Sequence, residues 1–236
     1  LSLAPHLICD GYWEMWITQA IKSIIKEGMT VVEIGANLGY YTTLISSLVG
    51  PSGEVHAFEA NPRLYDILSS NVNINGFLDR TKVINKAVYE RSGQLDFFAL
   101  QKHQGGSRVL PFSEEFVKFY NDQVVKISVP TITLDEYWRR QKKNIDIIKI
   151  DAEGSEPFIV LGMKEIIDSQ ENLVLVCEFS KPFFEGSKKS PVEFLNFFEK
   201  RNFSLSKINY LGQIIPTTVD EIIRSPHHEE LVFQKK

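Results

Sequence analysis

Short apolar runs alternate with helix-like patterns along most of the 236-residue chain. Two of these runs, 145–150 and 173–179, are almost continuously apolar, as strands covered on both faces of a sheet must be. Apolar runs separated by helix-length segments are typical of parallel βαβ units. The sequence therefore predicts an open, doubly wound α/β sheet, whose ligand crevice lies beyond the carboxyl ends of the strands.

Turn-forming residues and apolar periodicity set the expected element boundaries. A leading helix at 13–26 places its apolar residues on one face and lies outside the sheet. Residues 88–128 are less regular, and we interpret them as an insertion over the sheet edge. The predicted strands are 30–34, 54–59, 82–86, 94–98, 125–129, 145–150, 173–179, 203–208 and 230–234; the predicted helices are 38–48, 62–74, 155–168 and 191–201, with capping boxes at Thr133/Glu136 and Ser190/Glu193.

Charge and cysteine content exclude several classes of partner and site. Lys and Arg number 26 against 30 Asp and Glu, so no global positive field draws nucleic acid or an anionic membrane surface. Cys9 and Cys177 are too few for a disulfide scaffold or a cysteine-built zinc site. No segment approaches the roughly 18 apolar residues of a membrane span. We therefore expect one domain over residues 1–236, soluble and cytoplasmic; its first residue, Leu1, fits a processed chain or a segment of a longer one.

The most informative motif is a strand that runs into a glycine-rich turn and then a helix, at 31–41. Gly35 and Gly39, in the pattern ExGxxxG, permit a tight turn and a close approach of the backbone to a ligand. Glu33 offers a carboxylate that can accept a hydrogen bond from an ammonium group. S-adenosylmethionine, with its sulfonium and amino acid tail, suits this site better than a dinucleotide, which favours GxGxxG. The alternative is a turn of this kind without a ligand.

A second acid, Glu59, ends the next predicted strand. A carboxylate at this place in a doubly wound sheet can bind two ribose hydroxyls, because its two oxygens match adjacent O–H donors. Adenosyl and NAD sites share this feature, so it supports an adenosine-bearing cofactor without choosing between them. The third strand ends near the expected adenine, where Asn85 or a backbone group can meet the edge of the ring.

Three acids, Asp151, Glu153 and Glu156, follow a central predicted strand. Asp151 and Glu153 lie at the crevice end, so either can bind a substrate hydroxyl or act as a general base. The alternative for Glu153 and Glu156 is that they favour the helix amino end through its dipole. Glu178 ends the next strand beside Asp151, and two such acids could hold a divalent cation. With no third ligand evident, we expect no metal site.

Taken together, these blocks resemble the FkbM family of S-adenosylmethionine-dependent methyltransferases over about residues 28–180, and 148–156 is the most family-specific block. Glu33 stands where Asp is common in the family. The resemblance implies a class I methyltransferase fold, which is Rossmann-like, with a mostly parallel seven-stranded sheet whose last strand is antiparallel. It also implies O-methylation, often of sugar or secondary-metabolite hydroxyls, with S-adenosylhomocysteine as the other product.

With this resemblance the chain divides into a leading helix (1–28), a cofactor-binding core (29–180) and a C-terminal helix with strands (181–236). The partner we expect is a small-molecule or glycan hydroxyl acceptor. The expected catalytic residues are Asp151, Glu153 and Glu178. The expected cofactor-binding residues are Glu33, Gly35, Ala36, Asn37, Gly39, Tyr41, Glu59, Ala60, Asn61, Asn85, Lys86, Ala87 and Asp151.

For a hydroxyl acceptor, a base must take the proton as the new bond forms. Asp151 or Glu153 is the first candidate, followed by Glu178 and by His103, which lies in a loop that could close over the site. Tyr12 and Trp13 could wall the acceptor pocket, although Trp13 also fits the packing stripe of the first helix.

Three other functions are alternatives to O-methylation. N-methylation of a protein or small-molecule amine stays open, but the Asp/Asn-Pro-Pro-aromatic turn of base N-methylation is replaced by Asp-Ala-Glu-Gly at 151–154. A nicotinamide-dependent oxidoreductase would share the fold and Glu59, yet it would require the GxGxxG pattern that this chain lacks. A non-catalytic adenosyl-binding module is the remaining alternative.

Overall fold

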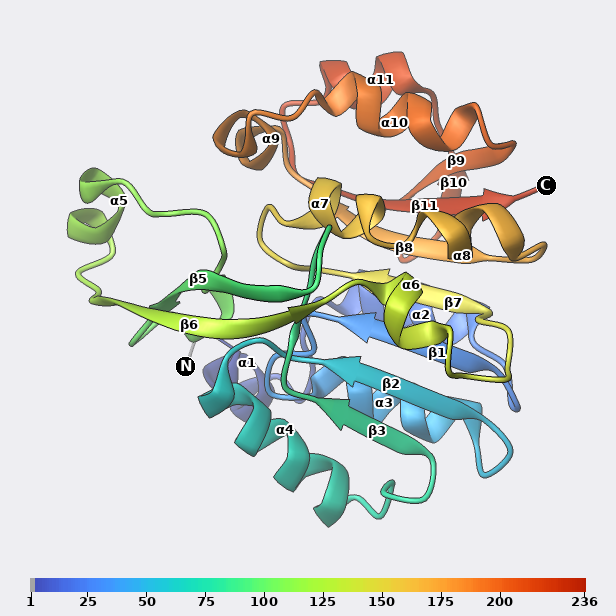
Figure 1. The fold of residues 1–236 in the computed structure, drawn as a ribbon, viewed down its shortest axis with the longest axis horizontal. Helices are drawn as coiled ribbons and strands as arrows, with labels where there is room; N and C mark the ends of the chain where they lie inside the picture. Colours follow the sequence, from blue (N-terminus) through green and yellow to red (C-terminus); the bar gives the residue numbers. More distant parts are fainter. Residues whose placement is uncertain (1–2) are drawn as a thin grey trace.

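An eight-stranded sheet forms the centre of the computed structural model, which describes residues 3–236 (Figure 1). The strand order is β10-β9-β11-β8-β7-β1-β2-β3. The strands on the β3 side are parallel: β3 (Thr81–Ile84), β2 (Glu54–Phe58), β1 (Thr30–Ile34), β7 (Ile147–Ile150) and β8 (Val174–Phe179). The remaining three are β11 (Glu229–Lys235), antiparallel to β8, then β9 (Phe203–Ile208) and β10 (Ile214–Pro216). The doubly wound sheet and its antiparallel last strand are confirmed.

The number of strands differs from the expected seven because β10 adds an eighth at the sheet edge. The chain reverses after β9 in a turn where the backbone N–H of Asn209 donates to the carbonyl of Gln213, and Gly212 has a φ of +74°. Proline ends this short strand, as is common at a sheet edge, where no further ladder bond is needed. A three-residue strand is too short to show an alternating pattern in the sequence.

Helices cover both faces of the main sheet because consecutive strand residues point to opposite faces. Val31 packs with α2 (Met15–Ile24) and α3 (Tyr40–Val49), whereas its neighbour Val32 belongs to the larger core on the other face. The helix α4 (Pro62–Ile74) shares the face of α3. The other face carries α6 (Leu134–Trp138), α7 (Glu156–Leu161), α8 (Lys164–Ser169), α10 (Pro191–Glu199) and α11 (Val219–Arg224).

Side-chain caps begin several of these helices as the sequence predicts. The hydroxyls of Thr133 and Ser190 accept the N–H of the third helical residue of α6 and α10. The full capping box is wrong for both helices. At α6 the carboxylate of Glu136 accepts from Ser92 instead, and at α10 the described contacts include the Ser190 cap but no return bond from Glu193. A complete box lies between Thr218 and Glu221 at α11, a helix that was not expected.

Other differences from the expected elements are local. The helix expected at 155–168 is two helices, which meet at Gly162, where a Cβ would collide with the carbonyl of Tyr89. Two short helices, α1 (Ala4–Cys9) and α9 (Lys181–Ser187), were not expected. None of the helices within residues 3–236 has the length and apolarity that a membrane crossing requires.

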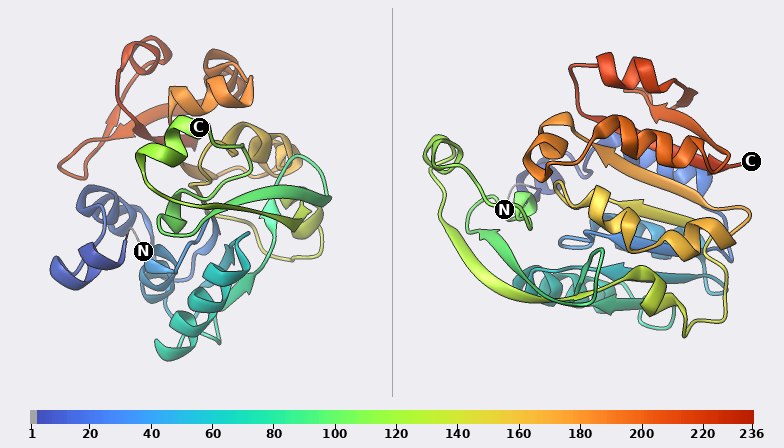
Figure 2. Two further views of the ribbon diagram at one scale, coloured as in Figure 1. Left: turned by 90° about the vertical axis from the view of Figure 1, so that its left-hand side faces the viewer. Right: turned by 45° about the horizontal axis from the view of Figure 1, so that its top comes forward.

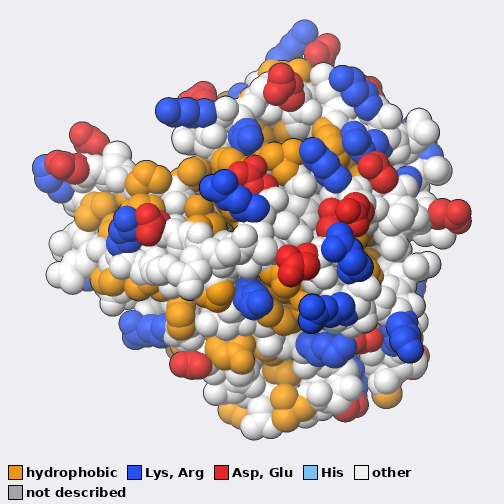
Figure 3. Space-filling model, in the orientation of Figure 1, with side chains coloured by type: hydrophobic (Ala, Val, Ile, Leu, Met, Phe, Trp, Pro, Cys, Tyr) orange, Lys and Arg blue, Asp and Glu red, His pale blue; other side chains and the backbone are white. Residues whose placement is uncertain are grey.

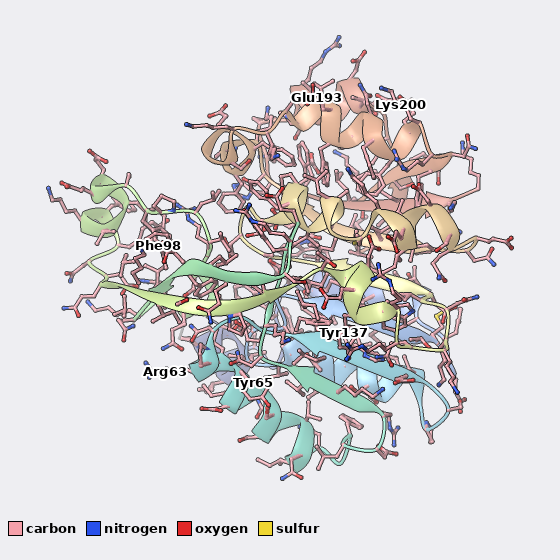
Figure 4. The ribbon with its side chains drawn as sticks, viewed as in Figure 1. Arg63, Tyr65, Phe98, Tyr137, Glu193 and Lys200 are labelled. Carbon is pink, nitrogen blue, oxygen red and sulfur yellow. The ribbon has the colours of Figure 1, made fainter. Side chains whose placement is uncertain are left out.

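The inserted region forms a second sheet with the order β4-β6-β5. Its strands are β4 (Ala87–Val88), β5 (Gly93–Leu100) and β6 (Val124–Ile132), with a 3₁₀ turn η1 (Gln104–Gly106) and helix α5 (Glu114–Phe119) between the last two. The β5–β6 hairpin and α5 form an arm that projects beyond the carboxyl ends of the main strands, and Figure 2 shows it from two further directions. Phe98 lies on this arm (Figure 4).

Candidate functional site

A cavity of about 220 Å³ lies at the carboxyl ends of β1, β2, β3, β7 and β8. The ends of these strands and the loops after them form what we call its floor, and residues 97–109 of the arm form its roof. The predicted site residues that line it are Gly35, Ala36, Asn37, Tyr41, Glu59, Ala60, Lys86, Ala87, Asp151, Glu153 and Glu178. The predicted residues that lie outside its wall are Glu33, Gly39, Asn61 and Asn85.

The turn between β1 and α3 is shaped by contact with the neighbouring strand. Gly35 has a φ of +85°, and a Cβ there would collide with the carbonyl oxygen of Asp151. The backbone N–H groups of Gly35 and Ala36 both donate to the carbonyl of Phe58, at 3.0 Å. The close approach expected at Gly35 is therefore one of backbone to backbone, and it holds the floor at the point where β1, β2 and β7 end.

Glu59 lines the floor with its carboxylate held by the backbone. One oxygen accepts from the N–H of Asn37 at 2.8 Å and the other from the N–H of Asn61 at 2.7 Å. Burial raises the pKa of Glu59 to about 7, although these donors act in the opposite direction. Each oxygen retains a second lone pair, so this donor-oriented carboxylate fits the adjacent hydroxyls of a ribose.

Glu33 lies below the floor rather than in the cavity wall. It is 1% exposed and accepts a hydrogen bond from the hydroxyl of Thr42 at 2.6 Å, and burial raises its pKa to about 7. The contact expected between Glu33 and a ligand ammonium is not available at the cavity surface. Glu14 lines the cavity instead and accepts from the phenol of Tyr41 at 3.1 Å.

The other three residues outside the wall shape the floor from behind. A Cβ at Gly39 would lie 2.7 Å from Leu68, so this glycine lets α4 pack closely. Asn61 caps α4 by accepting the N–H of Arg63 at 3.1 Å. The side-chain amide of Asn85 donates to the carbonyls of Glu59, at 2.8 Å, and Ala60, at 3.3 Å, so it joins the ends of β2 and β3.

Carboxylates dominate the opposite part of the cavity, which we call the acid end. Glu178 and Glu230 are direct cross-strand partners in the β8–β11 ladder, a like-charge pairing that destabilises a sheet. Oε1 of Glu178 lies 3.8 Å from Nδ1 of His228, whereas its Oε2 is buried without a hydrogen-bond partner among the described residues. The acid end consists of Glu14, Asp151, Glu153, Glu178 and Glu230.

One buried lysine partly balances this charge. Lys149 is 3% exposed, and its Nζ lies 3.0 Å from Asp151 and 4.6 Å from the centre of the Tyr41 ring. Although burial opposes it, attraction by Asp151 and Glu33 raises the pKa of Lys149. Asp151 is thereby oriented by a buried cation.

Glu153 occupies a different environment from Asp151. It has a φ of +51°, an unusual conformation for a residue with a side chain, and it is followed by Gly154 at +96°. Burial, and then repulsion by Glu178 and Asp151, raise the pKa of Glu153 well above its usual range. Arg108 of the roof is a cation that faces it. This combination suits a carboxyl group that exchanges a proton.

The remaining candidates are His103, expected as a proton acceptor, and Tyr12 and Trp13, expected to wall the acceptor pocket. His103 lies outside the cavity wall, because its ring contacts Asp122 at 3.0 Å. Trp13 lines the cavity, whereas Tyr12 is 40% exposed and does not. Within residues 3–236, no group of three or more His, Cys, Asp or Glu side chains is arranged to hold a metal ion.

Sequence reasoning missed Glu14, Glu230 and Gln104 of the cavity wall. Glu230 reaches the site because β11 inserts between β8 and β9, a pairing that no local pattern reports. Glu14 begins α2, and only its place beside Tyr41 reveals it. The Gly105–Gly106 pair marked a loop, but nothing in the sequence showed that Gln104 beside it would be buried.

Comparison with known proteins agrees with this geometry. A family model, the methyltransferase FkbM domain, matches residues 33–205. The methyltransferase sdnD of Sordaria araneosa is 28% identical over 159 residues, which cover 57% of this chain and 60% of that protein. A protein-L-isoaspartate O-methyltransferase of Methanococcoides burtonii is 37% identical over 83 residues, which cover 34% of this chain and 36% of that protein. The chain thus spans less than two thirds of either relative.

Solved structures share the fold at low sequence identity. An O-methyltransferase of Bacillus cereus, solved in complex with SAH, aligns with a TM-score of 0.52 and 14% identity over 94% of this chain and 80% of that one. An rRNA methylase of Streptococcus thermophilus aligns with a TM-score of 0.51 and 13% identity over 93% of this chain and 94% of that one. The class I methyltransferase fold is therefore confirmed. The chain belongs to the FkbM methyltransferase family, whose members use S-adenosylmethionine.

Proposed function

We propose that the protein transfers the methyl group of S-adenosylmethionine to a hydroxyl of a sugar or another small molecule. The observation that carries this proposal is that Glu59 and the acid end line one cavity. The floor at Glu59 fits an adenosine ribose, and the acid end fits a cationic centre beside an acceptor that donates hydrogen bonds. Residues 1–236 are proposed to form one domain, since β11 pairs with both β8 and β9.

The bound cofactor supplies a methyl group on a positively charged sulfur, so positioning the acceptor provides much of the catalysis. Asp151, held by Lys149 at 3.0 Å, accepts a hydrogen bond from the acceptor hydroxyl and orients it. Glu153 in its ionised form then takes the hydroxyl proton.

The charge of the acid end also restricts the class of acceptor. Several carboxylates face the cavity there, so a phosphate or carboxylate on the acceptor would be repelled. Positive and negative side chains are interspersed over the face shown in Figure 3, without an extended basic surface for a nucleic acid. We therefore propose an uncharged polyhydroxyl acceptor. An amine acceptor is the second candidate, because Oε2 of Glu178, which has no hydrogen-bond partner within residues 3–236, could accept from an ammonium group.

Calorimetric titration with S-adenosylmethionine, S-adenosylhomocysteine and NAD tests the cofactor assignment. We expect the two adenosyl ligands to bind and NAD to be silent, whereas binding of NAD alone would contradict the proposal. Methyl transfer from labelled cofactor to methyl glycosides and to simple amines then separates the two acceptor classes. Glu153→Gln should keep cofactor affinity and lose turnover by about 100-fold or more, whereas the exposed Glu199→Gln should retain both.

A further inference from the structure

The roof contains a buried polar group that the proposed chemistry does not use. Gln104 is 3% exposed and lines the cavity. Its Nε2 lies 3.4 Å from the carbonyl of Gln101, and its Oε1 is buried with no hydrogen-bond partner among the described residues. A carbonyl oxygen only accepts hydrogen bonds, so the amide nitrogen must be the atom facing Gln101. The oxygen of Gln104 is therefore an acceptor that lacks a donor.

The turn that carries Gln104 is held in place by one carboxylate. Asp122, which is 7% exposed, accepts the backbone N–H groups of Gln101, Lys102 and His103 at 3.1, 2.9 and 2.8 Å. Although burial opposes it, these donors hold the pKa of Asp122 well below its usual range. Asp122 therefore stays charged at neutral pH and fixes the turn, so that the orientation of Gln104 is set before a ligand binds.

The roof loop stands over the ends of β2 and β3. Its base is closed by backbone hydrogen bonds between Phe98 and Arg108. The residues on either side of that base, Phe97 and Val109, pack in one apolar cluster with Ala60 and Ala87 of the floor. Apolar walls with one neutral acceptor suit a flat heteroaromatic ring that carries an N–H donor on its edge.

The side-chain amide expected to meet that ring is already occupied. Asn85 donates to the carbonyls of Glu59 and Ala60 and lies outside the cavity wall. The ribose-binding Glu59 immediately precedes Ala60, so an adenine attached to that ribose reaches the apolar walls under the roof. The exocyclic amino group of adenine is the donor that this end of the cavity lacks.

We propose that Gln104 is a specificity-determining residue for the cofactor, whose Oε1 accepts a hydrogen bond from the adenine amino group. This inference rests on the proposed binding of an adenosyl cofactor in the cavity. Adenine is thereby recognised from the roof as well as from the floor, and a purine with an oxygen at the same position would face Oε1 with an acceptor and be rejected.

Calorimetry with S-adenosylhomocysteine and S-inosylhomocysteine tests the inference, because the two ligands differ in that one ring substituent. The wild-type protein should bind S-adenosylhomocysteine at least about 10-fold more tightly than S-inosylhomocysteine. Gln104→Leu should lower the affinity for S-adenosylhomocysteine about 5- to 10-fold. It should lower the ratio of the two affinities by about the same factor. Gln104→Glu keeps an acceptor oxygen and should preserve the preference. Gln123→Leu, an exposed glutamine on the same arm, is the matched control.

The outcomes separate this inference from the proposed function. If the wild-type protein binds neither ligand, the assignment of the cavity to an adenosyl cofactor fails. If it binds S-adenosylhomocysteine and Gln104→Leu alters both ligands equally or neither, the cofactor assignment stands and the role of Gln104 is overturned. Thermal unfolding of each variant shows whether a loss of affinity reflects loss of the fold.

Discussion

The floor and the roof of the cavity are built in different ways. The floor is made by strand ends that pack on one another, as where Gly35 touches Asp151, and the carboxylate of Glu59 there is bonded to backbone donors. The roof is a loop held by Asp122, and within residues 3–236 the oxygen of Gln104 there has no donor. The difference teaches that residues proposed to bind the ligand from the floor also hold the fold together, whereas a roof residue such as Gln104 can be assigned to the ligand alone.

Gly35→Ala should have the largest effect and should damage both functions of the floor. The new Cβ would collide with the carbonyl of Asp151, so β1 and β7 must separate where they line the cavity. We expect a loss of about 3 kcal/mol or more in the free energy of unfolding and a loss of S-adenosylhomocysteine affinity of about 100-fold or more. Denaturant unfolding and calorimetry measure the two.

Gly76→Ala is the control for that substitution. Gly76 also has a positive φ, +74°, but a Cβ there meets no atom within 4 Å. The cost should be about 1 kcal/mol of stability from the backbone conformation, with no change in affinity. If Gly35→Ala behaved like Gly76→Ala, the contact with Asp151 would not be what holds the floor.

The floor is also the part that the sequence predicts well. The turn at Gly35 and the acid at Glu59 follow apolar strands directly, so local periodicity places them in space once the sheet is assumed. Glu33 is the exception, since the motif gives its position along the strand, but not that Thr42 and the core enclose it. A strand-end acid can face the cavity or lie beneath it, and packing decides which.

The roof and the acid end depend on pairings between distant segments. The parallel pairing of β4 with β6 joins residues 44 positions apart, Ala87 with Thr131, and this bends the inserted arm over the cavity. Glu230 meets Glu178 only because β11 inserts beside β8. Neither pairing leaves a local pattern, whereas the capping box at Thr218 and Glu221 was present in the sequence and could have predicted α11.

Asp122→Asn tests the contribution of the roof to ligand affinity separately from that of the floor. The substitution replaces one acceptor oxygen by an NH₂ group, so at least one of the N–H donors of the turn at 101–103 loses its partner. We expect S-adenosylhomocysteine affinity to fall about 5- to 10-fold and the free energy of unfolding to fall by about 1–2 kcal/mol. Calorimetry and denaturant unfolding report both effects.

Asp96→Asn is the matched control on the same arm. Asp96 is exposed and forms a surface ion pair with Lys126 at 2.8 Å, which contributes little to stability. Affinity and stability should therefore stay close to those of the wild-type protein. Equal effects of the two substitutions would mean that the arm as a whole, rather than the turn at Asp122, supports the roof.

Glu230→Gln should give the smallest effect and distinguishes the acid end from the roof by charge. S-adenosylmethionine and S-adenosylhomocysteine differ by a methyl group and a positive charge, so the carboxylates of the acid end should favour the charged ligand. Removing the charge of Glu230 should lower that preference about threefold, although it should raise the unfolding temperature, because it relieves the repulsion of Glu178 across the ladder. Gln104→Leu should lower the affinities for S-adenosylmethionine and S-adenosylhomocysteine by the same factor, because both carry adenine. It should therefore leave the preference for the charged ligand unchanged.

The pH dependence of the same preference gives an independent check. Burial raises the pKa of Glu230 well above its usual range, and the pKa values of Glu153 and Glu178 are raised as well, so these groups lose their charge at a higher pH than an exposed glutamate does. His228, whose pKa is raised by Glu178 at 3.8 Å, gains charge as the pH falls. Glu14 follows the acids, whereas Lys149 and Arg108 stay charged throughout. All these changes make the acid end less negative as the pH falls. The preference for S-adenosylmethionine over S-adenosylhomocysteine should therefore be larger at pH 8.5 than at pH 6.

Glu229→Gln is the matched variant, because Glu229 lies on the same strand but is bonded to Lys207 at 3.2 Å. This variant should keep the pH dependence of the preference. A preference independent of pH would show that the sulfonium does not approach the acid end.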